Sequence, residues 1–232
     1  MASFAVAYGG TYGGSYRLNM SVDLVSQNVS ANTSYVRIRV WMSRISSSGG
    51  DIWNNGATGW SANVDGQGYS GSIVQGHLGN GGSITMLDTY KTIGHNADGT
   101  RSFGFSAGHN SDNSPYQTSA SGSGSMTLPT INRYATITSY TRDQITDTSF
   151  RVNVATDVTC DILQYSLNGG AWTSVGSGTF TSRNFTISNL KSATSYTVKV
   201  RVRRQDSALY TESSTSTVVT LAQNNFLGRR WP

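Results

Sequence analysis

Alternation of apolar and polar residues with a period of two is the feature of this chain that most limits its fold. Apolar residues occupy every second position from Leu18 to Leu24, and again from Val36 to Met42. Side chains of a strand point to opposite faces in turn, so this pattern predicts strands with one buried face. No stretch shows the 3.6-residue period of a helix. The chain is therefore expected to be all-β.

Composition supports folded strands and argues against disorder. Hydrophobic residues make up 36% and charged residues 12% of the 232 residues, against about 45–50% and about 25% in average globular proteins. The balance is rich in Ser, Thr, Asn and 26 Gly, which favour turns over helices. Aromatic residues reach 10%, whereas disordered chains contain few. The length suffices for two ordinary domains, each with its own core.

The first predicted domain covers residues 1–128 and is expected to be a jelly-roll-like β-sandwich. Further candidate strands lie at residues 60–64, 83–93, 102–107 and 116–126. Clusters of Gly, Asn and Ser separate the strands, as is typical of antiparallel sandwiches. The small residues of Ser119–Gly124, followed by Leu128-Pro129, indicate the end of this domain and a short linker.

A second domain is predicted over residues 129–221, followed by a C-terminal arm at 222–232. Seven strand patterns recur there, at residues 135–140, 149–155, 161–167, 172–175, 183–187, 196–203 and 216–221. Asn168-Gly169-Gly170 supplies residues that tolerate positive φ in a tight hairpin turn. Thr194 and Tyr196 precede an alternating strand and fit a tyrosine corner, in which the phenol bonds back to the upstream backbone.

These motifs resemble a fibronectin type III domain of the kind found in bacteria and their phages. The resemblance implies a Greek-key sandwich that acts as a binding or spacing module without chemistry of its own. The inward positions expected for it are Phe150, Val152, Val154, Ile162, Tyr165, Phe185, Ile187, Leu190, Tyr196, Val198, Val200 and Val202.

Charge and cysteine content limit the partners and the compartment. The formal charge of +5 comes from 17 basic and 12 acidic residues, but the basic residues are spread along the chain, so solvated strand faces are favoured over a nucleic-acid site. Cys160 is the single cysteine, so neither an intrachain disulfide nor a thiolate metal cluster is expected. The N-terminus lacks the pattern of a signal peptide, and no stretch reaches about 18 apolar residues. We expect cytoplasmic synthesis and no membrane insertion.

Catalytic and metal-binding patterns are weak, so the chain is not expected to be an enzyme. The three histidines, His77, His95 and His109, do not show the close spacing of a metal motif, and they are interpreted as strand-end residues that bond to turn backbone. Glu212 is the single glutamate, and the aspartates fall in turn contexts. No nucleophile elbow or phosphate-binding loop is present. No catalytic, cofactor or metal residue is predicted.

Aromatic and arginine side chains are the candidates for contact with partners. Trp53 flanks the loop Asn54-Asn55-Gly56, whereas core packing is favoured for Trp41 and Trp60. A row of outward basic residues on the strand near Val202 could touch a partner. The apolar residues of the arm predict docking on a neighbouring subunit, or alternatively on its own domain. The candidate contact residues are Phe226, Leu227, Arg229, Arg230, Trp231, Trp53, Arg201 and Arg203.

The first domain carries a second signature, from Asn32-Thr33-Ser34 to the turn Ile93-Gly94-His95-Asn96-Ala97-Asp98-Gly99. This pattern ahead of a fibronectin-like domain resembles minor structural and minor tail proteins of siphoviruses. The resemblance implies a non-enzymatic virion component of the tail or tail tip, a homo-oligomer among other virion proteins, which can contact a host cell-surface glycan. A capsid decoration protein is the nearest alternative. A carbohydrate-binding module is a third.

Overall fold

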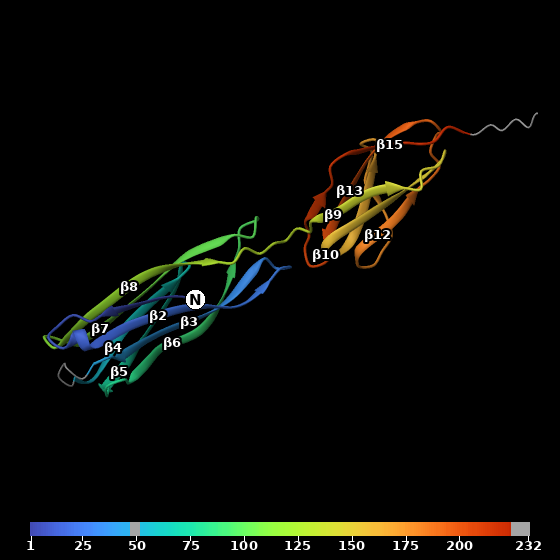
Figure 1. The fold of residues 1–232 in the computed structure, drawn as a ribbon. Helices are drawn as coiled ribbons and strands as arrows, with labels where there is room; N and C mark the ends of the chain where they lie inside the picture. Colours follow the sequence, from blue (N-terminus) through green and yellow to red (C-terminus); the bar gives the residue numbers. More distant parts are fainter. Residues whose placement is uncertain (47–51, 224–232) are drawn as a thin grey trace, which may run out of the picture. The chain divides into compact units, whose positions relative to one another are not determined.

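A computed structural model describes residues 1–46 and 52–223 of the chain. They form antiparallel sheets in two compact units, one up to residue 132 and the other from residue 133 to the last described residue, 223 (Figure 1). The predicted all-β architecture is confirmed. Within the described ranges, no helix has the length and apolar character needed to cross a membrane.

Unit 1 is a sandwich of two four-stranded sheets. Sheet I has the strand order β1-β2-β3-β6 and sheet II the order β5-β4-β7-β8. The strands of sheet I are β1 (Ala2–Ala7), β2 (Tyr16–Asn28), β3 (Thr33–Arg44) and β6 (Ser83–Gly94). Those of sheet II are β5 (Gln67–His77), β4 (Trp53–Val64), β7 (Arg101–Asn113) and β8 (Gln117–Leu128). Pairing of β3 with β6 and of β4 with β7 places the β4–β5 hairpin across the sandwich from β3 and β6.

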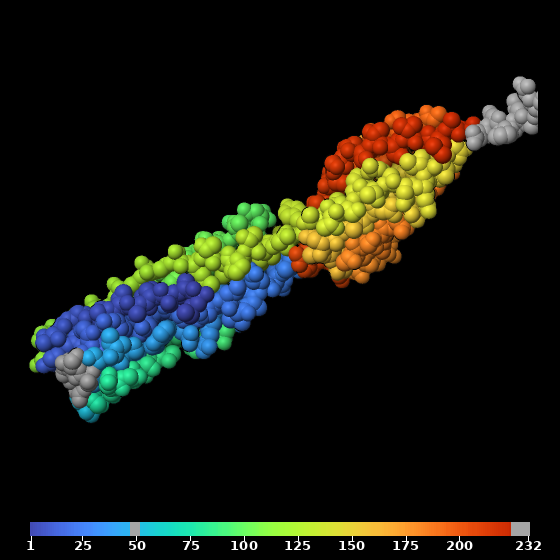
Figure 2. Space-filling view, in the orientation of Figure 1, coloured from blue at the N-terminus to red at the C-terminus, as the bar shows by residue number. Residues whose placement is uncertain are grey.

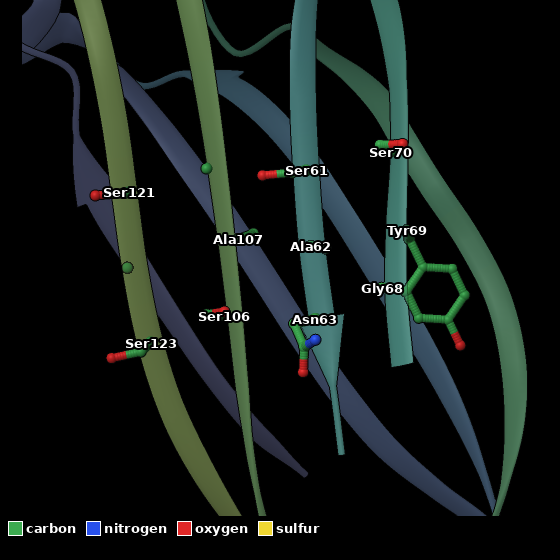
Figure 3. Close-up of a pocket in the computed structure, with 12 residues that line it drawn as sticks. Ser61, Ala62, Asn63, Gly68, Tyr69, Ser70, Ser106, Ala107, Ser121 and Ser123 are labelled. Carbon is green, nitrogen blue, oxygen red and sulfur yellow. The ribbon is translucent and has the colours of Figure 1, made fainter. Parts of the chain in front are cut away.

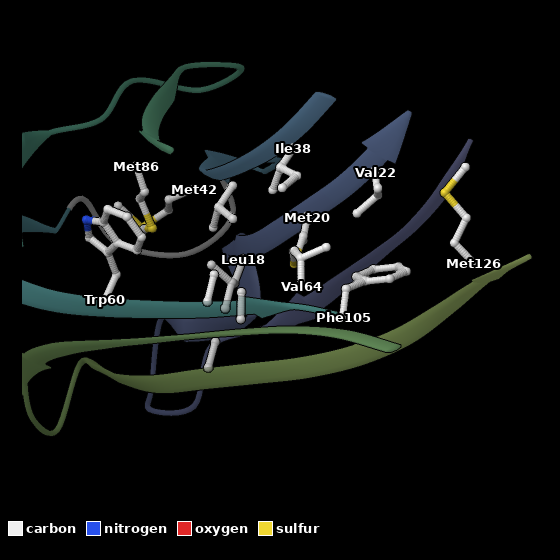
Figure 4. Packing of buried hydrophobic residues seen from close by; sticks show 14 of the residues in the cluster. Leu18, Met20, Val22, Ile38, Met42, Trp60, Val64, Met86, Phe105 and Met126 are labelled. Atoms are coloured by element: carbon white, nitrogen blue, oxygen red, sulfur yellow. The ribbon is translucent and has the colours of Figure 1, made fainter. Parts of the chain in front are cut away.

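The core of unit 1 lies between the inner faces of the two sheets. Leu18, Met20 and Val22 of β2 are fully buried, as the alternation predicted. Figure 4 shows them facing Val64 and Phe105 of sheet II. Aromatic rings also pack on glycines at the rim: a Cβ added to Gly122 would lie 2.7 Å from the Phe4 ring. Strand β1 is thereby held against β8.

The end of unit 1 lies beyond the predicted boundary at residue 128. Gln27 donates a hydrogen bond to the Pro129 carbonyl at 2.8 Å, and the Ile131 amide donates to the Gly99 carbonyl at 2.9 Å. Ile131 is also buried. The segment up to residue 132 therefore belongs to unit 1.

Unit 2 is built around one long strand whose two halves pair with different neighbours, so that its seven strands are all connected by hydrogen bonds. Strand β10 (Phe150–Leu167) pairs through its first half with β9 (Ile137–Asp143) and β12 (Phe180–Ile187). Its second half pairs with β11 (Thr173–Ser174) and β13 (Ser195–Arg204), and β13 pairs with β14 (Tyr210–Glu212) and β15 (Ser216–Val219). This connectivity is that of a fibronectin type III sandwich.

The sequence motifs of unit 2 form the predicted local structures. The Tyr196 hydroxyl accepts a hydrogen bond from the Lys191 amide at 2.8 Å, which completes the tyrosine corner. Asn168 and Gly169 have φ values of 51° and 72°, and the Gly170 amide donates to the Leu167 carbonyl at 2.9 Å. The turn that follows β10 is therefore closed as predicted.

Two details of β10 differ from the prediction. The strands expected at 149–155 and 161–167 are halves of one strand, joined where the register shifts between Ala155 and Cys160. A second shift between Cys160 and Ile162 changes which side chains face inward. Leu163 is therefore fully buried, and the predicted inward position of Ile162 is wrong.

Candidate functional site

The predicted contact residues of the C-terminal arm, Phe226, Leu227, Arg229, Arg230 and Trp231, lie outside the described residues.

Trp53 is the most exposed of the described tryptophans. It begins β4, pairs in register with His77 at the end of β5, and keeps 66% of its surface exposed. Its indole stacks on the His77 imidazole, with ring centroids 4.5 Å apart and planes 18° apart. The stack fixes a large aromatic surface that faces solvent. Trp60, by contrast, is buried in the core as predicted. The core packing predicted for Trp41 is wrong, because its position in β3 alternates with buried Val40 and Met42 and places it on the outer face of sheet I.

A second exposed stack lies at the same end of the sandwich. Tyr12 and Tyr116 stack at 5.7 Å with an angle of 8°, and Tyr116 is 49% exposed. The Tyr12 amide donates to the Tyr116 carbonyl at 2.8 Å, which joins the β1–β2 and β7–β8 loops. Asn54 next to Trp53 donates to the Ser111 carbonyl at 2.5 Å, which links β4 to β7 between the two stacks.

We name the two stacks together, Trp53–His77 and Tyr12–Tyr116, the aromatic end of unit 1. Gly, Ser and Asn dominate the sequence around them. The combination of rigid Tyr and Trp rings with small, adaptable polar residues is typical of recognition loops. The chain leaves unit 1 at the other end, where Leu128 pairs with Arg101.

The predicted basic row of unit 2 is engaged within the unit. The Arg201 guanidinium lies 4.5 Å from the ring centroids of both Trp172 and Tyr210, and its Nε donates to Gln164 at 2.7 Å. Arg203 forms an ion pair with Asp161 at 2.7 Å. Lys199 pairs with Glu212. The charges of Lys199 and Arg203 are thus paired with carboxylates, whereas Arg201 keeps its charge and is held in place by two rings and an amide.

The histidines have three different environments. His95 follows β6 and bonds to the Ser34 hydroxyl and to the Gly99 carbonyl, each at 2.7 Å, which fits the predicted turn role. His109 does not fit it, because its alternating position in β7 turns the ring into the core, where it is 3% exposed. Among the described residues, no group of three or more His, Cys, Asp or Glu side chains could hold a metal ion.

His109 lies in a buried hydrogen-bond chain. The Tyr8 hydroxyl lies 2.8 Å from Nδ1, the Thr58 hydroxyl lies 2.9 Å from Nε2, and Thr58 donates to the Ile73 carbonyl at 3.2 Å. With the Thr58 proton directed to that carbonyl, Nε2 carries a proton and Nδ1 accepts one from Tyr8. Burial lowers the pKa of His109 from 6.5 to about 4. The imidazole is neutral at pH 7 and holds the β1–β2 loop against sheet II.

The outer face of sheet II holds a shallow groove of about 840 Å³. Serine hydroxyls, one amide and Tyr69 line it, as Figure 3 shows, and the labelled polar residues include Ser61, Ser106, Ser121, Ser123 and Asn63. The lining contains no charged side chain and no histidine. It therefore offers neither a general base nor an activated nucleophile.

Comparison with known proteins assigns the family. A family model described as "Siphovirus protein of unknown function (DUF859)" matches residues 5–225. The chain belongs to this siphovirus family. No curated protein matches the chain.

Solved structures similar to this siphovirus protein are fibronectin arrays. The central fibronectin-III array of RIM-binding protein is 16% identical, with 88% of this chain and 68% of that chain covered, at a TM-score of 0.32. A two-domain fibronectin type-III segment of chicken tenascin is 10% identical, with 87% and 98% covered, at a TM-score of 0.29. The strand connectivity of unit 2 itself identifies its fold.

The candidate residues that the sequence prediction did not name are three tyrosines, Tyr116, Tyr35 and Tyr90, whereas Tyr12 stood out in the glycine-rich start of the chain. Tyr116 and Tyr12 meet from loops more than a hundred residues apart. Tyr35 and Tyr90 stack on the outer face of sheet I. The exposure of Tyr35 could have been predicted from the sequence, because Tyr35 occupies one of the polar, outward positions of the alternating run that forms β3.

Proposed function

We propose that the chain is a non-catalytic structural component of a siphovirus particle, in the tail or tail tip, and that unit 1 contacts the host surface or a neighbouring virion protein. The observation that carries the proposal is the aromatic end of unit 1. A Trp that is 66% exposed yet fixed by stacking suits a contact surface better than a monomer surface. Membership of the siphovirus family supports the virion setting.

The state of the carboxylates supports a role without catalysis. Asp88 is bound by the guanidinium of Arg37, and Asp143 by that of Arg151. In each case the hydrogen bond from arginine holds the pKa of the carboxyl below its ordinary value. A general acid requires the opposite, a carboxyl with a raised pKa. These carboxylates are thus structural partners of arginine.

Separation of purified particles into heads and tails, followed by mass spectrometry, tests the location. We expect the chain in the tail fraction. Its recovery with heads would favour the alternative, a capsid decoration protein. Its absence from both fractions would contradict a virion role.

Replacement of the exposed ring tests the contact surface. We expect Trp53→Ala to leave the melting temperature of unit 1 within about 2 °C, because the side chain is largely solvated, and to reduce incorporation into particles or adsorption to cells about 10-fold. Leu221→Ala is the matched control, since Leu221 is 57% exposed on unit 2. Equal infectivity of the two variants would contradict the role of Trp53.

A further inference from the structure

The outer face of sheet I carries a platform of stacked tyrosines. Tyr35 of β3 and Tyr90 of β6 lie on neighbouring strands, with ring centroids 5.2 Å apart and planes 8° apart. They remain 41% and 48% exposed. The pairing fixes both rings on the sheet, so a ligand can stack on them without ordering them first.

Charged pairs continue the platform along the same face. Arg37 binds Asp88 in a two-pronged ion pair, with Nε–Oδ1 at 2.8 Å and Nη2–Oδ2 at 2.5 Å. Arg39 lies 3.2 Å from Asp23, and its guanidinium sits 5.7 Å from the centre of the Trp41 ring. A groove of about 230 Å³ runs between these side chains, lined by Arg37, Arg39, Val40, Trp41, Ser83, Thr85 and Asp88.

This face differs from the opposite one. The groove on sheet II is lined by uncharged residues, mostly small ones, with Tyr69 as the aromatic member of the lining, and charged residues make up only 12% of the chain. Sheet I nevertheless combines three aromatic rings with two arginine–aspartate pairs on one surface. Cross-strand pairs of this kind also stabilise a sheet, but such a role does not require that the tyrosines stay about half exposed beside an open groove.

We propose that the outer face of sheet I binds a neutral polysaccharide, with the sugar rings on Tyr35 and Tyr90 and their hydroxyls on Arg37 and Asp88. An aromatic face packs against the apolar C–H side of a pyranose ring. A hydroxyl is both donor and acceptor, so vicinal hydroxyls can bond to a guanidinium and to the carboxylate beside it.

The charge of the face favours a neutral polymer. Arg37 and Arg39 each face a carboxylate, so an anionic polymer would meet Asp23 and Asp88 at the same place. Binding should therefore depend little on salt. This inference rests on the proposed function, because it names the host-surface ligand of a virion protein.

The experiment uses the full-length protein on an array of neutral bacterial polysaccharides, followed by calorimetric titration with the best-bound soluble oligosaccharide at 50 mM and 500 mM salt. We expect binding that changes less than about threefold between the two salt concentrations. Tyr35→Ala and Tyr90→Ala should each weaken it at least about 10-fold, the scale of lost contact at an aromatic anchor.

Two further variants separate this role from folding. Arg37→Lys keeps the positive charge but loses the planar guanidinium, which can donate two parallel hydrogen bonds. We expect this variant to bind more weakly while its melting temperature stays close to that of the parent. Tyr134→Ala is the matched control, because Tyr134 is 46% exposed on unit 2, and it should leave binding unchanged.

Three results would overturn the proposal. They are the absence of binding to any neutral polysaccharide, unchanged affinity in Tyr35→Ala and Tyr90→Ala, and preferential binding of an anionic polymer that is lost in salt. None of these affects the proposed function, which is tested separately by the presence of the chain in tails.

Discussion

At the scale of single residues, His109 makes the stability of unit 1 depend on pH. Its pKa is about 4 in the folded protein, against 6.5 for an unperturbed imidazole. The unfolded chain therefore takes up a proton at a higher pH than the folded one. The contribution to stability is complete above pH 6.5, falls as the pH drops, and is lost below about pH 4. The difference between the two pKa values corresponds to a loss of unfolding free energy on the order of 3 kcal/mol at low pH.

Urea unfolding of unit 1 between pH 7 and pH 4 measures this contribution. We expect His109→Gln to flatten the pH dependence relative to the parent protein. Val74→Ala is the control, because Val74 is 56% exposed on the same unit and carries no ionisable group, so the pH dependence should stay that of the parent. Parallel pH profiles for the parent and His109→Gln would contradict the assignment of a neutral, buried imidazole.

The tyrosine corner makes a second prediction for a single residue. Tyr196→Phe removes the hydroxyl that accepts from the Lys191 amide and leaves that amide without its partner. We expect unit 2 to lose about 1–3 kcal/mol of unfolding free energy. In Tyr165→Phe the loss should be near zero, because the Tyr165 hydroxyl makes no hydrogen bond to the described part of the chain and its ring keeps its stack on Phe185. Equal losses in the two variants would contradict the corner.

The sequence was informative for residues whose role is local. The Tyr196 corner and the exposed Trp53 followed from neighbouring residues. The environment of Arg201 did not, because Gln164, Trp172 and Tyr210 reach it from three other segments of unit 2. The same holds for His109, whose partners Tyr8 and Thr58 lie on separate segments of unit 1.

At the scale of elements, strands with strong alternation were predicted and weak ones were missed. Strands β2 and β3 bury Leu, Met, Val and Ile on one face, so their pattern is clear. Strand β5 was not predicted, because Gly and Ser occupy many of its positions and leave no alternation of apolar and polar residues. Its extended conformation is held by hydrogen bonds to β4. Strand β1 was missed because alanines occupy two of its exposed positions, Ala5 and Ala7, so that polar and apolar residues do not alternate along it.

The packing of β1 on β8 predicts a strong effect of one methyl group. A Cβ at Gly122 would approach the Phe4 ring to 2.7 Å, so Gly122→Ala must displace the Phe4 ring from its place between β1 and β8. We expect a loss of about 1–3 kcal/mol, as for other overpacked sites. At Gly104 of the neighbouring strand, the nearest atom would lie 3.9 Å away. In thermal unfolding, the melting temperature of Gly104→Ala should therefore be close to that of the parent protein. Equal melting temperatures of Gly122→Ala and Gly104→Ala would contradict this packing.

At the scale of the whole molecule, each unit has its own core. The buried clusters of unit 1 and unit 2 share no residue. We therefore expect residues 133–223 to fold alone, with the unfolding free energy that unit 2 shows in the full chain. Circular dichroism and urea unfolding of that fragment provide the measurement. An unfolded fragment would show that unit 2 depends on the rest of the chain.

The most direct test of the central claim is the copy number of the chain in gradient-purified phage particles. A structural component should appear at a fixed ratio to the major tail protein, from one preparation to the next, and should stay bound through a high-salt wash. Quantitative mass spectrometry of intact particles measures this ratio. The result we predict is a constant ratio. Absence of the chain from infectious particles, or a ratio that falls towards zero on washing, would contradict a structural role in the virion.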